Sequence, residues 1–362
     1  MNLTLSVIKA AVGRVGGIGR PSQAALDTLR RRLEAERGRS IIDVQVRATG
    51  GGITALLTHR RGLGCELVHK LAWDGFAAAT RTARQQGLSG VPELLQDAFA
   101  DSRRVLQPMV AEMDIEERAA EPMLLFDTDQ ADASTFNLPL YLAFADPLHS
   151  PSWLQTLDGA GFDFQVAERG HPERLIELST PADLYLLARL LRDAERYQLV
   201  AVRTRAGEPA AAVGRPLPSA VGTVAAAADP VLLLRVHAPF PLPGEVLAPI
   251  AETPCLGGAA AAAILPLMPV SLGEAGSDGF GPPIVTCAAF SVHEGRLSDV
   301  ENVFAQPHWQ PVRERAARLA AALRRPLNQR PMAALPEALQ ACVEARLAAR
   351  PESNAPLLAR VV

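Results

Sequence analysis

Residues 110–126 read VAEMDIEERAAEPMLLF, and this stretch predicts two consecutive strands of a partly buried β-structure. Successive side chains of a strand point to opposite faces, so Met113 and Ile115 are expected to point inward. The acidic side chains around them would form the solvated or polar-interface face of the same strand: Glu112, Asp114, Glu116 and Glu117. We therefore expect strands at 110–118 and 123–126, one after the other along the chain.

Outward from this stretch, strand-like and helix-like segments are interspersed along the sequence. Strands are expected at 3–11, 41–47, 52–58, 230–237 and 283–293, and helices at 24–37, 66–86, 182–196, 312–325 and 335–349. The weakest part, 207–228, is rich in Ala, Pro and Gly and predicts an irregular loop. No long linker interrupts the pattern, which favours one α/β domain over 1–330, with 331–362 as a C-terminal helix and tail of the same domain.

Composition excludes some classes of partner. The 362 residues carry 36 Lys and Arg against 39 Asp and Glu, a net charge of −3, so no basic excess is present to bind nucleic acid or anionic lipid. No apolar run reaches the ~20 residues needed to span a bilayer, and the N-terminus alternates like a strand, which predicts a cytoplasmic protein. The cysteines are scattered, without metal-ligand spacing, and are expected to be reduced and mostly buried: Cys65, Cys255, Cys287 and Cys342.

Short motifs indicate no chemistry by themselves. The turn GRVGGIG at 13–19 lacks the G-x-G-x-x-G spacing of dinucleotide-binding loops. The DTD at 127–129 is similar to a phosphatase nucleophile motif, but that chemistry needs a downstream lysine, and the lysines of this chain are Lys9 and Lys70. The seven histidines have no metal-ligand spacing, and a G-x-S-x-G elbow is absent.

Longer segments are more specific. In order and spacing they resemble the bifunctional fructose-1,6-bisphosphate aldolase/phosphatase family of archaea and deeply branching bacteria, over roughly residues 3–325. The segments that carry the resemblance are LTLSVIKAAVG at 3–13, LLTHRRG at 56–62, ELVHKLAWDGF at 66–76, LLQDAF at 94–99, VAEMDIEERAAEPMLLF at 110–126, FNLPLYLAFADP at 136–147, ADPVLLLR at 228–235, LPLMPVS at 265–271, GPP at 281–283 and GRLSD at 295–299.

The resemblance implies an α/β fold, a single-domain four-layer α-β-β-α sandwich assembled as a homo-octamer. It also implies one site with several magnesium ions, where a lysine Schiff base condenses triose phosphates and the 1-phosphate is then hydrolysed. Several Mg²⁺ ions held together need several carboxylates, because the cations otherwise repel one another. Imine formation needs a desolvated amine with a proton shuttle nearby.

Carried over place by place, most of the family's functional residues are replaced in this chain. The Schiff-base lysine place is Ala227 and its tyrosine place is Val224, so no catalytic residue of the family type is expected. The metal-ligand places and their neighbours that are lost are Ala11, Ile18, Gly51, Gly52, Pro92, Gln130 and Ala228; the phosphate-binding stretch reads AAAAIL at 260–265, and two further places are Phe280 and Met332.

The metal-ligand places that remain are Asp129 and Asp229. Two separated carboxylates are too few for a multinuclear magnesium site. Because no lysine lies near the aligned catalytic segments, aldolase chemistry of the family type is not expected either. We therefore expect no cofactor, with magnesium bound only if a residual phosphatase activity persists.

Three hypotheses follow. The first is a pseudoenzyme that keeps the scaffold, with the octamer implied by the resemblance, and binds a partner protein, an active paralogue or another small molecule. The second is an enzyme of changed chemistry that acts on a phosphorylated sugar or another anion. The third is a residual magnesium-dependent fructose-1,6-bisphosphatase. Substrate-binding candidates on segments that border the family's site are Arg14, Arg20, His59, Arg60 and His237.

Overall fold

The computed structural model describes residues 2–15, 19–88, 108–151, 161–169, 171–216, 229–252, 254–256, 264–273 and 282–323. The chain divides into two compact units, Met1–Ala322 and Leu323–Val362. The described elements belong to the first unit, apart from the last residue of α6. The predicted helix at 335–349 and the predicted domain boundary at residue 330 lie outside the described residues.

The first sheet has the strand order β10-β4-β1-β3-β2. Its strands are β1 (Leu3–Ala11), β2 (Asp43–Thr49), β3 (Gly52–His59), β4 (Met109–Ile115) and β10 (Arg215–Pro216). The pairs β1–β3, β1–β4 and β2–β3 are antiparallel. Gly50, at φ +54° between β2 and β3, adopts the left-handed conformation that glycine tolerates best.

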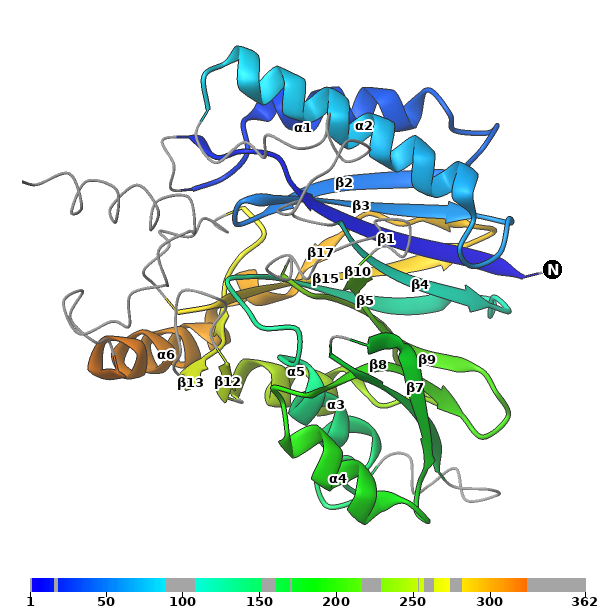
Figure 1. Ribbon diagram of the computed structural model, residues 1–362, viewed down its shortest axis with the longest axis vertical. Helices are drawn as coiled ribbons and strands as arrows, with labels where there is room; N and C mark the ends of the chain where they lie inside the picture. The colour runs from blue at the N-terminus through cyan, green and yellow to red at the C-terminus, as the bar shows by residue number, and fades with distance from the viewer. Residues whose placement is uncertain are drawn as a thin grey trace, which may run out of the picture. The chain divides into compact units, whose positions relative to one another are not determined.

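Two helices cover the outer face of this sheet, α1 (Gln23–Glu34) and α2 (Glu66–Gln85) (Figure 1). The Ser22 side chain caps α1 by accepting a hydrogen bond from the backbone of Ala25. Helical spacing brings Leu29 and Leu33 onto the same buried face. These side chains pack with Phe76 of α2 and the outward face of the sheet to form one core layer.

The second sheet is larger and has the order β14-β15-β5-β11-β9-β8-β6-β7, with β16 and β17 beside β15. Its strands are β5 (Glu121–Asp129), β6 (Phe162–Glu168), β7 (His171–Ser179), β8 (Tyr197–Thr204), β9 (Pro209–Val213), β11 (Val231–Arg235), β14 (Met268–Pro269), β15 (Ile284–His293), β16 (Arg296–Leu297) and β17 (Glu301–Asn302). A separate pair is formed by β12 (Pro254–Leu256) and β13 (Ile264–Pro266).

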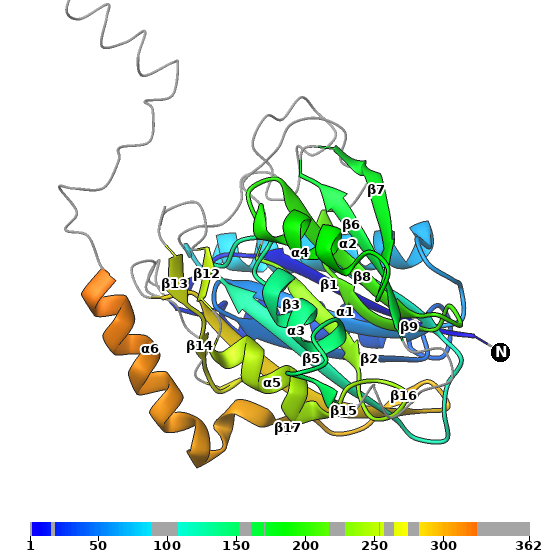
Figure 2. The ribbon, with the colours of Figure 1, turned by 90° about the horizontal axis from the view of Figure 1, so that it is seen from below.

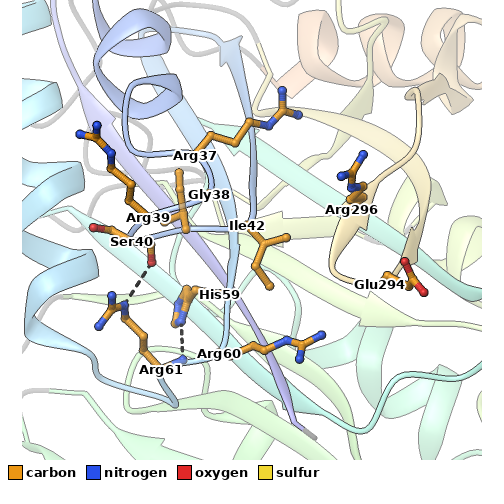
Figure 3. Close-up of a pocket in the computed structure, with 11 residues that line it drawn as sticks. Arg37, Gly38, Arg39, Ser40, Ile42, His59, Arg60, Arg61, Glu294 and Arg296 are labelled. Atoms are coloured by element: carbon orange, nitrogen blue, oxygen red, sulfur yellow. Dashed lines mark hydrogen bonds between the residues drawn. The ribbon is translucent and has the colours of Figure 1, made fainter.

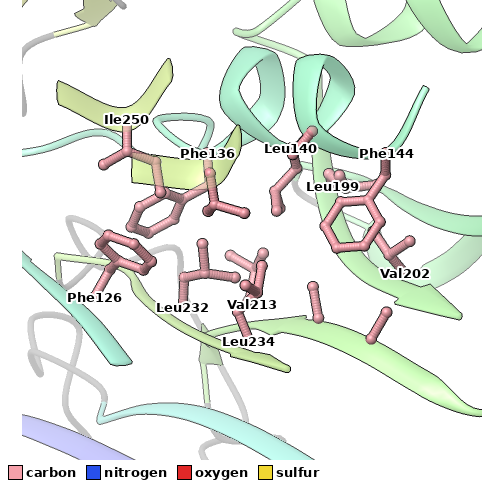
Figure 4. Packing of buried hydrophobic residues seen from close by; sticks show 14 of the residues in the cluster. Phe126, Phe136, Leu140, Phe144, Leu199, Val202, Val213, Leu232, Leu234 and Ile250 are labelled. Atoms are coloured by element: carbon pink, nitrogen blue, oxygen red, sulfur yellow. The ribbon is translucent and has the colours of Figure 1, made fainter. Parts of the chain in front are cut away.

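The outer face of the second sheet is covered by α3 (Asn137–Phe144), α4 (Leu184–Arg192) and α5 (Pro243–Glu252), and Figure 2 shows these helices over its strands. Short turns η3 (Val303–Ala305) and η4 (Pro307–Trp309) lead into α6 (Gln310–Leu323). Phe126, Phe136, Phe144 and Leu232 meet in this helix-side core (Figure 4). Phe144 and Phe162 pack edge to face at a centroid distance of 4.9 Å.

A third apolar layer lies between the two sheets. Leu5, Val7 and Met113 of the first sheet pack there against Leu125 and Leu233 of the second. The layers therefore follow the order helices, sheet, sheet, helices, and the predicted α-β-β-α sandwich is confirmed. No helix among the described residues has the length and apolar character needed to cross a membrane.

Most predicted elements are confirmed, with shifts at their ends. The strand over 110–118 is β4 and stops at Ile115, while the strand over 123–126 extends to Asp129. The prediction of an irregular loop over 207–228 is wrong in its first part. There Pro209–Val213 forms β9, because its small side chains fit between β8 and β11 in the buried sheet.

Candidate functional site

The layer between the sheets changes from apolar to charged at one end. On β1 the face that carries Leu5 and Val7 continues to Lys9, and on β5 the face that carries Leu125 continues to Asp127 and Asp129. Both changes occur at the same end of the sandwich, since Lys9 contacts Asp127 across the layer. This charged end is the candidate functional site.

Lys9 and Asp127 form its centre. The Lys9 ammonium donates to Asp127 Oδ1 at 2.6 Å and to the carbonyl of Thr128, and Thr54 donates to Asp127 Oδ2. Burial acts to lower the pKa of Lys9, but the nearby carboxylates of Asp127, Asp229 and Asp129 outweigh burial and raise it. Lys9 is therefore a protonated, paired amine at neutral pH.

Arg47 lies in the same row of the first sheet, since Thr54 is the register partner of Lys9 on one side and of Arg47 on the other. Both terminal nitrogens of its guanidinium are buried and have no hydrogen-bond partner. Burial lowers the pKa of Arg47 to about 10, against the opposing attraction of Asp127. Arg47 is thus a buried cation that is attracted by Asp127 but makes no direct contact through these nitrogens.

Asp129 ends β5 and is fully buried. Its Oδ1 accepts from the Arg14 guanidinium at 3.2 Å and from the backbone N–H of Gly51 at 3.2 Å, whereas its Oδ2 has no partner. A Cβ atom built on Gly51 would collide with the Arg14 guanidinium, and one built on Gly50 would collide with the Asp129 side chain. The turn between β2 and β3 therefore needs glycine so that these two charged groups fit beside it.

Asp229 reaches the same place from β11, which begins two residues later and pairs with β5 at Val231 and Asp127. Its Oδ1 accepts from the backbone N–H of Ala131 at 3.0 Å. Burial raises the pKa of Asp229 to about 7; Lys9 opposes this rise and Asp129 adds to it. The pKa of Asp229 therefore lies in the range useful for proton transfer at neutral pH.

The arrangement does not fit a multinuclear magnesium site. Such a site needs several carboxylate oxygens turned toward shared cations. Here the Oδ1 atoms of Asp127, Asp129 and Asp229 accept from side-chain cations or backbone N–H groups, and Asp129 Oδ2 lacks a partner. Within the described ranges no group of three or more His, Cys, Asp or Glu side chains is arranged to hold a metal ion. Lys9 and Arg14 supply the positive charge next to the aspartates.

The structure brings together three of the residues singled out from the sequence, Arg14, Asp129 and Asp229. Arg20 donates to the carbonyl of Gly273 and lines, with Arg30 and Arg47, a pocket of about 630 Å³. The places of Ala227 and Val224, the family's catalytic positions, lie outside the described residues, as do those of Ile18, Pro92, Ala228, Phe280 and Met332.

The other three substrate-binding candidates, His59, Arg60 and His237, lie away from the charged end. His59 ends β3 and Arg60 follows it, whereas Gly52 at the start of β3 borders the site. His59 and Arg60 line a different pocket, of about 800 Å³ (Figure 3). His237 follows β11 at the end opposite to Asp229, where its N–H donates to the carbonyl of Pro241.

One expectation needs correction, namely that no lysine lies near the catalytic segments. The Lys9 ammonium contacts Asp127 and lies within electrostatic reach of Asp129 and Asp229. Strand periodicity could have predicted the position of Lys9, since alternation from Leu5 and Val7 places it on the inward face of the strand. The same counting from Leu125 places Asp127 opposite it.

The sequence is similar to known proteins over most of its length. The fructose-1,6-bisphosphatase family profile matches residues 2–344. A protein of Thermus thermophilus named fructose-1,6-bisphosphate aldolase/phosphatase is 39% identical over 332 residues, 90% of this chain and 92% of the relative. Proteins of the same name from Cenarchaeum symbiosum (33% identical; 94% of this chain, 91% of the relative) and Moorella thermoacetica (34%; 89% and 86%) are also similar.

Proposed function

Since the chain belongs to the fructose-1,6-bisphosphatase family, whose similar members are named aldolase/phosphatases, we propose that it is a catalytically degenerate homologue that binds rather than converts its ligand. In this proposal the four-layer scaffold is kept, and the magnesium-dependent reactions of the relatives are lost. No cofactor is required for the remaining role. Family membership by itself leaves the activity open, because one fold supports many functions.

The position of Arg14 is the observation that carries the proposal. Its guanidinium lies where a side chain on Gly51 would project, and it forms an ion pair with the buried Asp129. By resemblance, Gly51 and Gly52 stand at places of a metal-binding aspartate pair. A fixed cation in that space neutralises Asp129 without a metal and would repel an incoming Mg²⁺ ion.

Lys9 supports the same conclusion for the aldolase step. A Schiff-base lysine must become neutral to attack a carbonyl, which requires a lowered pKa. Asp127 instead keeps Lys9 protonated, because its carboxylate accepts a hydrogen bond of 2.6 Å from the ammonium and raises its pKa. The only other lysine of the chain, Lys70, is on α2, the helix layer outside the first sheet.

The proposed role is that of a cytoplasmic scaffold, regulatory or binding protein. By family resemblance it would form a homo-oligomer, an octamer, and it would bind a protein partner such as an active paralogue. Neither nucleic acid nor membrane is proposed as a partner, since the chain has a net charge of −3.

A second candidate function rests on Asp229. Its pKa of about 7, beside the cation of Lys9 and the carboxylate of Asp129, gives the site a proton-transfer group next to a fixed positive charge. This combination favours an enzyme of changed chemistry that acts on a phosphorylated sugar or another anionic small molecule without a metal.

A phosphate-release assay distinguishes the candidates. The purified chain and the Thermus relative are incubated with fructose 1,6-bisphosphate, with MgCl₂ or with EDTA. We expect release by the relative with magnesium and none by this chain in either condition. Release by this chain only with magnesium would contradict the proposal in favour of a residual phosphatase, and release with EDTA would favour changed chemistry at Asp229, which Asp229→Asn should abolish.

A further inference from the structure

Five arginines surround the pocket that contains His59. They come from three segments: the turn after α1, the residues after β3 and the hairpin between β15 and β16 (Figure 3). The lining residues with charged side chains are Arg37, Arg39, Arg60, Arg61, Arg296 and Glu294. The pocket has a volume of about 800 Å³, enough for a small phosphorylated molecule.

The backbone that carries these arginines is well braced. The N–H of Gly38, at φ +78°, donates to the carbonyl of Ile41 at 2.8 Å, and the Ser40 hydroxyl donates to Glu36 at 2.8 Å. Asp43 links the turn after α1 to the β15–β16 hairpin through two hydrogen bonds. Its Oδ1 accepts from Arg37, and its Oδ2 accepts from the Leu297 N–H at 2.9 Å. The pocket is therefore largely preformed.

Its charge is strongly positive although the chain as a whole carries −3. Among the described residues that line it, there are five arginines and one acidic residue, Glu294. Within the described part of the chain Arg39 and Arg296 form no ion pair, and Arg37 pairs with Asp43. Burial lowers the pKa of His59, so its imidazole stays neutral at pH 7 and adds no charge.

The pocket is separate from the charged end between the sheets. His59 lies at the end of β3 and Gly52 at its start, seven residues apart, which is about 23 Å at a rise of ~3.3 Å per residue. Neither Arg14 nor Asp129 lines the pocket. A ligand here would therefore not occupy the candidate functional site.

We propose that this pocket binds a small molecule that carries two or more phosphate groups. Guanidinium groups match phosphate oxygens in bidentate pairs, and several of them on a rigid frame favour a multiply charged anion over a single one. The described residues of the lining include no aromatic side chain apart from the His59 imidazole, so the ligand is recognised through its phosphates and not through a stacked base. The pocket's charge is confined to one concave site, which favours a small anion over a nucleic acid, whose backbone needs an extended basic surface.

Calorimetry with inorganic tripolyphosphate tests the proposal, with pyrophosphate, orthophosphate, ATP and fructose 1,6-bisphosphate compared at fixed pH and ionic strength. We expect tripolyphosphate and pyrophosphate to bind at least tenfold more tightly than orthophosphate. Tighter binding of ATP than of fructose 1,6-bisphosphate would indicate a nucleotide ligand, and the reverse order would indicate a sugar phosphate. Failure of every anion to bind would overturn the proposal, and so would binding by orthophosphate as tight as by tripolyphosphate.

The double variant Arg39→Gln/Arg296→Gln locates the site, because both arginines are exposed and their loss should not affect folding. It should weaken tripolyphosphate binding at least tenfold. The matched control Arg81→Gln/Arg189→Gln changes the net charge equally at exposed helix positions and should stay within twofold of the unchanged chain. Equal weakening in the control, or no weakening in the pocket variant, would contradict the assignment.

A single variant, Arg14→Gln, separates this proposal from the proposed function. It removes a cation from the charged end and should leave tripolyphosphate affinity within twofold. Weakening by Arg14→Gln without weakening by Arg39→Gln/Arg296→Gln would move the anion site to the charged end and overturn the pocket proposal. The phosphate-release assay tests the proposed function separately, because it does not use the tripolyphosphate affinities of these variants.

Discussion

The Arg14 guanidinium lies 3.2 Å from Asp129 Oδ1 and fills the space where a side chain on Gly51 would project. Asp129 is fully buried, and an unpaired carboxylate there would be costly. A glycine at position 51 and an arginine at position 14 are thus parts of one arrangement, in which a side-chain cation neutralises an inherited aspartate.

Gly51→Ala tests whether these positions are coupled. The added methyl group collides with the Arg14 guanidinium, so the free energy of unfolding should fall by about 1–3 kcal/mol. In an Arg14→Ala background the space is open, and the cost of Gly51→Ala should drop by at least ~1 kcal/mol. Urea unfolding of the four proteins measures both values.

Gly244→Ala is the control for that cycle, because a Cβ at Gly244 meets nothing within 4 Å. It should change the free energy of unfolding by less than ~0.5 kcal/mol. Equal costs of Gly51→Ala in the two backgrounds would show that Arg14 does not occupy the space beside Gly51.

The buried pair of Lys9 and Asp127 should behave as a unit. Lys9→Met leaves Asp127 buried without its cation, and the free energy of unfolding should fall by about 3–5 kcal/mol. Adding Asp127→Leu removes the stranded charge and should restore much of the loss. Chemical unfolding compares the single and double variants; a double variant less stable than Lys9→Met would argue against the pairing.

Arg47→Met should stabilise the protein. The substitution removes a buried guanidinium whose terminal nitrogens have no partner and keeps a side chain of similar length. Burying polar groups without hydrogen bonds costs about 1–3 kcal/mol, and relief of that cost should appear as a higher Tm. The exposed Arg81→Met serves as the comparison; a lower Tm for Arg47→Met alone would indicate an interaction that the contacts of Arg47 do not reveal.

The raised pKa of Asp229 gives a pH dependence of definite sign. A carboxyl whose pKa is about 7 when folded and 3.8 when unfolded holds its proton more tightly in the folded state. Its stabilising contribution is therefore fully present below pH ~4 and is lost as the pH rises through about 7, by up to ~1.4 kcal/mol per pH unit. Asp229→Asn carries no titratable group, so its stability relative to the unchanged chain should rise across this window.

Urea unfolding of both proteins between pH 4 and 8 measures that difference, and because other titrating groups are common to both, they cancel. A stability difference that stays constant with pH would mean that Asp229 titrates alike in the folded and unfolded chain.

Much of the fold follows from sequence periodicity. Alternation in Met113 and Ile115 fixes the inward face of β4, and the spacing of Leu29 and Leu33 fixes the buried face of α1. The strand β9 is missed because its alanines have no strand preference of their own; pairing with β8 and β11 determines their conformation.

The candidate site is less predictable. Family resemblance identifies Asp129 and Asp229, which do lie close together. It also identifies the metal ligands that are missing, but not the side-chain cations that stand beside the aspartates instead. The ion pairs of Lys9 with Asp127 and of Arg14 with Asp129 join residues 118 and 115 positions apart, and only the stacking of the two sheets brings them into contact. His59 and Arg60 lie on a segment expected to border the family's site, yet they stand at the end of β3 that lies away from it.

Titration of the purified, EDTA-treated chain with MgCl₂ in a calorimeter tests the central claim most directly, with the Thermus relative titrated alongside. By the family resemblance the relative is expected to bind magnesium. If Lys9 and Arg14 have taken the place of metal ions, this chain should give no binding heat over the magnesium concentrations at which the relative does. Stoichiometric binding of two or more magnesium ions per chain would contradict the account.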